Sequence, residues 1–293
     1  MLTIEKIREG VGKCLVKAGT TYRADQFEAY RSAIGKETNK NARWVLERLV
    51  ENAEIAEKGK YPLCDDTGIP HVFLEVGNEI DLPKGWLPAI QEGVAEGLRA
   101  MPGRPMAIKG NDVERVEQSG GLAEDPAAVV PPSMITKAVA GNKLSVTVLL
   151  FGGGPEIRAK TYRIYHKRSM KRVVEEAAGW VAAEVGGLGC TPGTVAMGIG
   201  RSHTEAAMRM VEAMRQGDLR KQSEWEMRVT EIVNATKVGP LGMGGDYSVL
   251  GTFLNVGPAR ASGVRIVCVR PCCCVEPRRA TVSFDAAGNV TLE

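Results

Sequence analysis

Apolar and polar positions follow two periods along this chain, and together they predict helices mixed with short strands. In the first 60 residues Ile4, Ile7 and Val11 recur at helical spacing. Short apolar runs such as 72–76 are instead typical of buried strands. Further helices are predicted over 39–58, 85–100, 171–186, 203–216 and 219–236, and further strands over 143–150, 263–269 and near Val290. This pattern predicts an α+β fold, rich in helix with short β-sheets, in a single domain over residues 1–293.

Glycine-rich loops separate these elements and carry most of the polar chemistry. They cover 151–156, 186–202 and 237–251, and a proline-bounded loop surrounds Cys64. Glycine lets a backbone approach a bound group closely and point its N–H groups at anionic atoms. Residues 101–142 are rich in Pro, Gly and Asp, and we expect them to form a long loop with a functional or partner-facing role.

The composition excludes several classes of function. Of the 293 residues, 44% are apolar and 25% charged, as in ordinary globular proteins. The formal net charge of +3 and the 5% of aromatic residues do not fit nucleic-acid binding, which needs a basic stripe and stacking side chains. No segment resembles a signal peptide or an apolar run long enough to span a membrane. We therefore expect a cytoplasmic protein without membrane contact.

The cysteines are the first candidates for chemistry. In a reducing compartment, cysteines are more often metal ligands, catalytic groups or core residues than disulfides. Cys64, Cys190 and Cys274 lie in turns with polar neighbours, whereas Cys14 and Cys268 lie in apolar periodic segments that fit a core. The wide spacing of the first three resembles neither a zinc ribbon nor a ferredoxin. From spacing alone, metal ligation and plain burial both stay open for them.

Five short motifs favour metal ligation over plain burial for these cysteines. They are PLCDDTG around Cys64, FGGGPE, GCTPG around Cys190, VGPLGMGG, and CVEPRRA beginning at Cys274. With these motifs the chain resembles the class I fumarase and L-tartrate dehydratase family, specifically its α subunit or N-terminal domain. The family motifs read PLCQDTG, GGGSEN, GCPP, IGPMGLGG and C-W-A-x-R-R-A, in the same order. The resemblance extends over nearly the whole chain.

The resemblance implies an iron–sulfur hydro-lyase. A [4Fe–4S] cluster is implied on Cys64, Cys190 and Cys274, with its fourth iron left open as a Lewis acid for adding or removing water. Asp66 is implied as an active-site carboxylate, although capping of a turn or helix is the alternative for this residue. The substrate-binding residues that it implies are Asp65, Thr67, Gly152, Gly153, Gly154, Arg278 and Arg279. For the glycines a tight turn after a strand is compatible with that role, and for the two arginines a solvated basic pair is the alternative.

The resemblance also implies a substrate class and partners. The substrate is expected to be a small dicarboxylate or hydroxy acid of the fumarate/malate, tartrate/oxaloacetate or mesaconate/citramalate type, and no residue of the sequence chooses among these. In single-chain relatives a second domain supplies further catalytic groups. We therefore expect a separate β subunit, and the family suggests an α–α dimer within an α2β2 assembly.

The sequence departs from the family pattern at several positions. Asp65 stands where the family has glutamine, and Pro155 and Ile157 alter the GGGSEN motif. Residues 257–263 lack a histidine that is an active-site group in the family. A hydro-lyase is the leading hypothesis. A metal-binding regulatory or assembly protein that has lost catalysis is the second, and a structural subunit without metal is the third.

Overall fold

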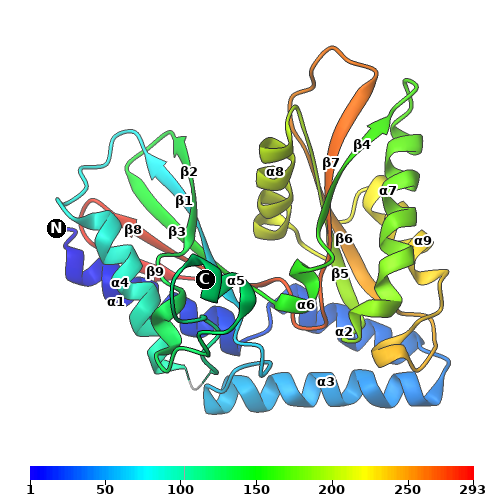
Figure 1. Cartoon of the computed structure of the whole chain (residues 1–293), viewed down its shortest axis with the longest axis horizontal. Coiled ribbons are helices and arrows are strands. Elements are labelled where there is room, and N and C mark those ends of the chain that lie inside the picture. The colour runs from blue at the N-terminus through cyan, green and yellow to red at the C-terminus, as the bar shows by residue number, and fades with distance from the viewer. Residues whose placement is uncertain (102) are drawn as a thin grey trace. The chain divides into compact units, whose positions relative to one another are not determined.

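The computed structural model describes residues 1–101 and 103–293, and its contacts divide the chain into two compact units (Figure 1). Each unit has a β-sheet and an apolar core of its own. Helix α3 (Lys40–Gly59) contributes its first part to unit 2 and its last part to unit 1. Unit 1 comprises Met1–Thr21, Ala53–Phe151 and Arg278–Glu293, and unit 2 comprises Tyr22–Asn52 and Gly152–Pro277.

Unit 1 is a mixed five-stranded sheet packed against helices. Across the sheet the strands are β2 (Ser133–Val139), β1 (Ile69–Gly77), β3 (Lys143–Phe151), β8 (Arg278–Asp285) and β9 (Val290–Leu292). Strands β1 and β2 run parallel, and the other neighbours run antiparallel. The unit also contains α1 (Ile4–Thr20), α4 (Trp86–Ala100), α5 (Asp112–Glu117) and η1 (Pro126–Val129). Alternate side chains of β3, such as Leu144 and Val146, share the core with the apolar faces of α1 and α4.

Unit 2 is a four-stranded sheet with helices on both faces. Across the sheet the strands are β4 (Lys160–Tyr165), β7 (Val264–Pro271), β5 (Gly193–Gly200) and β6 (Val249–Val256). The helices are α2 (Ala24–Lys36), α6 (Gly153–Glu156), α7 (Met170–Glu184), η2 (Val185–Leu188), α8 (His203–Gln216), α9 (Glu224–Asn234) and η3 (Pro240–Gly242). Val195, Met197 and Ile199 of β5 share a core with α7 and α9, whereas α8 covers the other face (Figure 1).

The strands of unit 2 bring three of the sequence motifs to one edge of the sheet. Cys190 precedes β5, the loop 237–248 precedes β6, and Cys274 follows β7. Strands β5 and β6 are parallel and β7 is antiparallel to β5, so these three loops lie at the same edge. At the opposite edge β4, β5 and β6 end and β7 begins. The eight residues of β5 separate the two edges by about 25 Å.

The α+β fold and the helices predicted from periodicity are confirmed, but several strands were missed. The prediction of a loop over 186–202 is wrong, because residues 193–200 form the fully buried strand β5. Its glycines have a packing reason, since a Cβ atom at Gly198 or Gly200 would collide with the backbone of α8 at Ala206. Strands β4, β6 and β8 were also missed.

The segment 101–142 is more regular than predicted. It contains α5, η1 and strand β2, which pairs with β1. Pro102 lies outside the described residues. Over residues 1–101 and 103–293, none of the helices combines the length and the apolar character needed to cross a membrane.

Glycine 193, at the start of β5, provides a test of this packing. A Cβ atom there would collide with the carbonyl oxygen of Cys272, which is backbone and cannot rotate away. We expect Gly193→Ala to lower the free energy of unfolding by about 3 kcal/mol or more, because the two strands must separate. Gly179→Ala is the matched control: Gly179 is an exposed helical residue with open space around it, so alanine should raise stability by about 0.5–1 kcal/mol. Denaturant titration of both variants checks this, and equal stabilities would contradict the packing argument.

Candidate functional site

Two of the three candidate cysteines lie on hydrogen-bonded backbone segments in unit 2. The backbone N–H of Cys274 donates to the carbonyl oxygen of Cys190 at 2.8 Å. Next to this bond, the N–H of Cys272 donates to the carbonyl oxygen of Thr194, also at 2.8 Å. The side chain of Cys190 is exposed, whereas Cys274 is 9% exposed. The fold therefore brings together two cysteines that are far apart in the sequence.

The backbone at Cys274 is held from the other side by helix α2 and by Tyr22, two residues before it. The carbonyl oxygen of Cys274 accepts hydrogen bonds from the hydroxyl of Tyr30 at 2.7 Å, the hydroxyl of Tyr22 at 3.1 Å and the side-chain amide of Gln26 at 3.3 Å. The two tyrosine rings are stacked, and all three side chains are buried. Because both the N–H and the carbonyl of Cys274 are bonded, the direction of its side chain is constrained.

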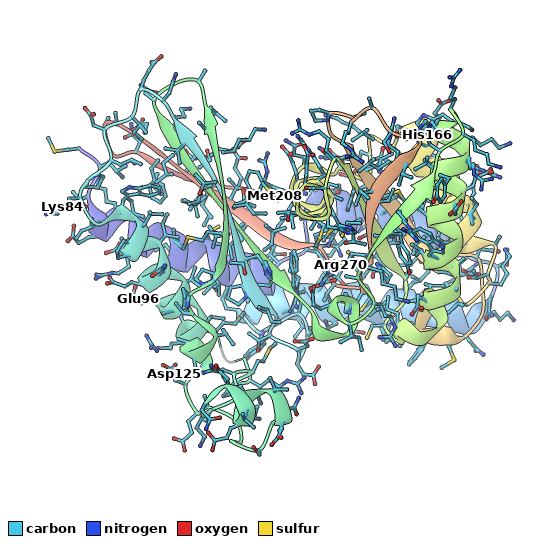
Figure 2. All side chains as sticks on the ribbon, turned by 45° about the horizontal axis from the view of Figure 1, so that its top comes forward. Lys84, Glu96, Asp125, His166, Met208 and Arg270 are labelled. Atoms are coloured by element: carbon cyan, nitrogen blue, oxygen red, sulfur yellow. The ribbon has the colours of Figure 1, made fainter. Side chains whose placement is uncertain are left out.

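A buried ion pair underlies the same turn. The guanidinium of Arg270, a residue labelled in Figure 2, faces the carboxylate of Glu276. The two side chains share two hydrogen bonds, of 2.8 and 3.2 Å, and both are fully buried. The carboxylate also accepts from the N–H of Gly152 at 2.5 Å and from the N–H of Cys273 at 3.4 Å. Arg270 donates in addition to the carbonyl of Gly152 at 3.3 Å. The pair therefore joins the first glycine of FGGGPE to the cysteine turn.

The loop with the sequence VGPLGMGG lies against the Cys190 segment. The hydroxyl of Thr191 donates to the carbonyl of Gly239 at 2.5 Å, and the N–H of Leu241 donates to the carbonyl of Thr191 at 3.0 Å. Gly239 and Leu241 both have positive φ, at 68° and 47°, which bends the loop tightly. Three motifs of the resemblance, around Cys190, Gly239 and Cys274, are thus neighbours in unit 2.

Of the other candidates, Gly153 and Gly154 lie in unit 2 at the start of α6, and the rest lie in unit 1 with Cys64. One nitrogen of Arg278 (Nη1) donates to the carbonyls of Asp66 at 2.6 Å and Thr67 at 3.0 Å, and the residue is 2% exposed. Asp65 is exposed, and its carboxylate accepts from the N–H of Asp66 at 2.9 Å and lies 3.4 Å from the thiol of Cys64. Arg278 is therefore a buried brace for the Cys64 loop, and not part of a solvated basic pair. Its neighbour in sequence, Arg279, is half-buried.

Comparison with known families identifies the chain. The sequence profile of the family described as Fumarate hydratase (Fumerase) matches residues 8–283. The chain belongs to the fumarate hydratase family. Fumarate hydratases are hydro-lyases, enzymes that add or remove water.

Individual relatives of the fumarate hydratase family show where the similarity lies. The chain is 25% identical over 293 residues to a Methanocaldococcus jannaschii protein provisionally named L(+)-tartrate dehydratase subunit alpha, covering 96% of this chain and 99% of the relative. It is 22% identical to the Escherichia coli (strain UTI89 / UPEC) L(+)-tartrate dehydratase subunit alpha, covering 99% and 94%. It is 24% identical to a Geobacillus stearothermophilus protein provisionally named fumarate hydratase class I, covering 85% of this chain but 49% of that relative.

The thiols of this fumarate hydratase family member differ in environment. Burial raises the pKa of Cys14 to about 12 and that of Cys272 to about 12, so both are neutral thiols at neutral pH. Burial also raises the pKa of Cys64, and the hydrogen bond from the Asp66 backbone opposes this. Cys14 and Cys272 therefore behave as buried apolar residues.

The donor set fits an iron–sulfur cluster in part. Such clusters take cysteine thiolates, and Cys190 and Cys274 offer two thiols from hydrogen-bonded segments among glycines. Cys64 belongs to unit 1. Within residues 1–101 and 103–293, no three or more His, Cys, Asp or Glu side chains gather as they do around a metal ion. The contacts thus bring the backbones of Cys190 and Cys274 together, while ligation by all three cysteines stays a prediction from the motif resemblance.

Sequence reasoning missed the residues that hold the cysteine turn. Arg270 and Glu276 lie in VRPCCCVEP, where isolated charges in an apolar run were the available signal. Tyr22, Gln26 and Tyr30 recur every four residues, a spacing that places them on one helix face. Neither signal identifies the partner: Tyr22, Gln26 and Tyr30 bond a carbonyl more than 200 residues away, and the pairing of Arg270 with Glu276 depends on the turn between them.

Proposed function

We propose that this chain is the α subunit of a [4Fe–4S]-dependent hydro-lyase that acts on a small dicarboxylic or hydroxy acid. Cys64, Cys190 and Cys274 are the proposed cluster ligands. The observation that carries the proposal is the backbone hydrogen bond from Cys274 to Cys190, at a sheet edge where two further family motifs lie. When bound, the cluster supplies an open iron that acts as a Lewis acid on the departing hydroxyl.

The residues of this chain have distinct proposed tasks around the substrate. Asp66 is the proposed active-site carboxylate, and Asp65 and Thr67 are proposed substrate contacts. Arg278 fixes the backbone of Asp66 and Thr67 through one nitrogen, while its Nε has no partner among the described residues and can serve a substrate carboxylate. Arg279 is a proposed second carboxylate contact.

The glycine motif has a divided role in this proposal. The N–H of Gly152 already donates to Glu276. We therefore assign Gly152 to positioning the loop, and keep Gly153 and Gly154 as the proposed substrate contacts. The two units are proposed to serve as one catalytic domain.

The proposed assembly contains a separate β subunit and an α–α dimer, giving α2β2, in the cytoplasm. Its support is that two of the relatives above are named subunit alpha. The third relative is about twice the length matched here, as expected if it joins the two parts in one chain.

Metal analysis and an activity assay test the proposal together. Purified without oxygen, the chain should contain about four iron and four acid-labile sulfide per molecule, with visible absorbance that air bleaches. Co-expressed with its β subunit, it should hydrate fumarate or mesaconate, or dehydrate tartrate. Iron without activity on any of these acids would favour the regulatory alternative, and no iron after anaerobic reconstitution would refute the cluster.

One departure from the family bears little on the ligands. The loop 257–263 lacks the family histidine, and in unit 2 it connects β6 to β7 at the edge opposite Cys190. Its change therefore leaves the contacts of Cys190 and Cys274 intact. The lost histidine affects the identity of the substrate or the catalytic groups, and not the two thiols.

A further inference from the structure

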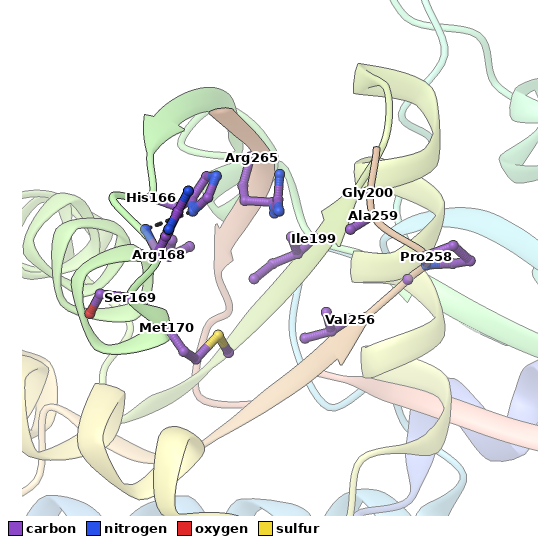
Figure 3. Close-up of a pocket in the computed structure, with 12 residues that line it drawn as sticks. His166, Arg168, Ser169, Met170, Ile199, Gly200, Val256, Pro258, Ala259 and Arg265 are labelled. Atoms are coloured by element: carbon purple, nitrogen blue, oxygen red, sulfur yellow. Dashed lines mark hydrogen bonds between the residues drawn. The ribbon is translucent and has the colours of Figure 1, made fainter. Parts of the chain in front are cut away.

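A cavity lies at the other edge of the unit 2 sheet, remote from Cys190 and Cys274. Its volume is about 200 Å³, and it opens between the start of α7 and the chain that follows β6 (Figure 3). Strands β5 and β6, which are parallel, both end there. The carboxyl ends of parallel strands are where open α/β sheets commonly bind small molecules. The length of β5 separates this cavity from Cys190.

The wall of the cavity is mostly apolar. Met170 and Val173 come from α7, Ile199 from the end of β5, and Val256 and Pro258 from the end of β6 and beyond (Figure 3). Among the residues that the structure describes, no acidic side chain lines it. A molecule with two charged ends would have to bury one of them against these side chains without a partner, which is unfavourable. The wall therefore favours a ligand with an aliphatic body.

Two arginines supply positive charge at the cavity, and neither has an acidic partner in the described part of the chain. Arg265 donates from Nη1 to the carbonyls of Ser262 at 3.1 Å and Val264 at 3.0 Å, and it forms no ion pair. The side chain of Arg168 likewise forms no ion pair among those residues. Nearby cations differ: Arg172 pairs with Glu176 within α7.

Local backbone contacts hold Arg168 at the cavity. Lys167 and Arg168 both have positive φ, 45° and 56°, which is unfavourable for side chains other than glycine. The ring of His166 stabilises this turn, because Nδ1 accepts from the N–H of Arg168 at 2.9 Å and Nε2 lies 2.8 Å from the carbonyl of Ser262. With Nδ1 accepting, Nε2 is the nitrogen that donates to the Ser262 carbonyl, so both ring nitrogens help to hold this turn. Helix α7 also starts at this point, with its positive dipole end.

We propose that this cavity binds a small organic monocarboxylate with a short, branched aliphatic body. The carboxylate lies with Arg265 and Arg168, and the aliphatic part contacts Met170, Ile199 and Val256. The cavity volume of about 200 Å³ is enough for a short, branched acid such as isovalerate. The site takes neither a bare inorganic anion, which leaves the apolar wall unfilled, nor a dicarboxylate.

Calorimetry on the full chain tests this proposal, with isovalerate as the probe. Isovalerate should bind. Its neutral amide and inorganic phosphate should each bind at least about tenfold more weakly, because the amide lacks the negative charge and phosphate lacks the aliphatic body. Arg265→Ala and Arg168→Ala should each raise the dissociation constant about tenfold. Arg163→Ala is the matched control, because Arg163 is an exposed arginine on β4 that does not line the cavity.

Three results of this experiment would contradict the proposal. Binding of isovalerate that is unchanged in Arg168→Ala, or no binding to the wild-type chain, would overturn the proposal. Phosphate binding as tight as isovalerate would also overturn it, because the apolar wall would then have no role. Arg168 makes no side-chain hydrogen bond or ion pair among the described residues, so its alanine variant keeps the test valid even if Arg265→Ala fails to fold. The measurement needs neither cluster nor β subunit, so it stands apart from the proposed hydro-lyase activity.

Discussion

Replacing Cys190 or Cys274 with serine is expected to abolish iron binding by the anaerobically purified chain. Each variant removes a proposed thiolate ligand, and a serine hydroxyl is a much poorer ligand for a soft iron–sulfur cluster. The backbone hydrogen bond between the two segments does not involve either side chain, so both variants should fold. Iron and acid-labile sulfide per chain are the measured quantities, with circular dichroism as the check on folding. Cys64→Ser tests the third ligand in the same way.

Two matched controls make this result specific. Cys14 lies in the core of unit 1, so the chain with Cys14→Ser should keep its full iron content. Cys272 lies two positions before Cys274, and its buried sulfur contacts the guanidinium and the carbonyl of Arg270. The chain with Cys272→Ser should also keep its iron. If Cys273→Ser loses iron and Cys274→Ser does not, the ligand is the preceding cysteine. Full iron content in Cys190→Ser would refute the ligand assignment.

Replacing Glu276 with glutamine is expected to destabilise the protein by about 3–5 kcal/mol, because it leaves the buried charge of Arg270 with the partly exposed Glu156 as its one remaining acidic partner among the described residues. The variant also weakens the acceptor for the N–H of Gly152. For a chain of this size we expect the melting temperature to fall by roughly 5–15 °C. Thermal and denaturant unfolding of the chain measure both quantities.

A double variant separates the lost charge pairing from lost packing. Arg270→Met with Glu276→Leu removes both charges and keeps apolar volume, so it should be more stable than Glu276→Gln alone. The double variant, unlike Glu276→Gln, has no side-chain acceptor for the Gly152 N–H, so recovery should be incomplete. A loss below about 1 kcal/mol in Glu276→Gln would mean that the existing ion pair of Arg270 with the half-exposed Glu156, at 3.3 Å, is enough to compensate the buried charge.

The fold could be predicted where the residue pattern has a strong period. Helices such as α8 have apolar residues on one face, and β3 alternates Leu144, Val146, Val148 and Leu150 into the core, so both were predictable. Strand β5 was missed because glycine in a sequence indicates loops as often as close packing. Its alternation was present: Val195, Met197 and Ile199 face one core, and the positions between them are small because α8 lies close.

The candidate site was predictable only as far as the motifs extend. Motif resemblance identified Cys190 and Cys274, and the fold places them on hydrogen-bonded segments. The supports of the Cys274 carbonyl, such as Tyr30, could not be predicted, because a hydroxyl donor in a helix has no feature in the sequence that specifies a carbonyl more than 200 residues away. Arg270 and Glu276 are a similar case, since burial of a charge depends on a partner that tertiary structure provides.

The arrangement of β5 also bears on how such a protein can diverge. Its two ends carry different loops, the thiol-bearing segment at one and the chain around 257–263 at the other, with a fully buried strand between them. Mutations can accumulate in the far loop while selection preserves the cysteine contacts, because neither loop is the packing partner of the other. A lineage could thus lose the histidine of that loop and acquire a new ligand preference while inheriting the same cysteine-bearing backbone.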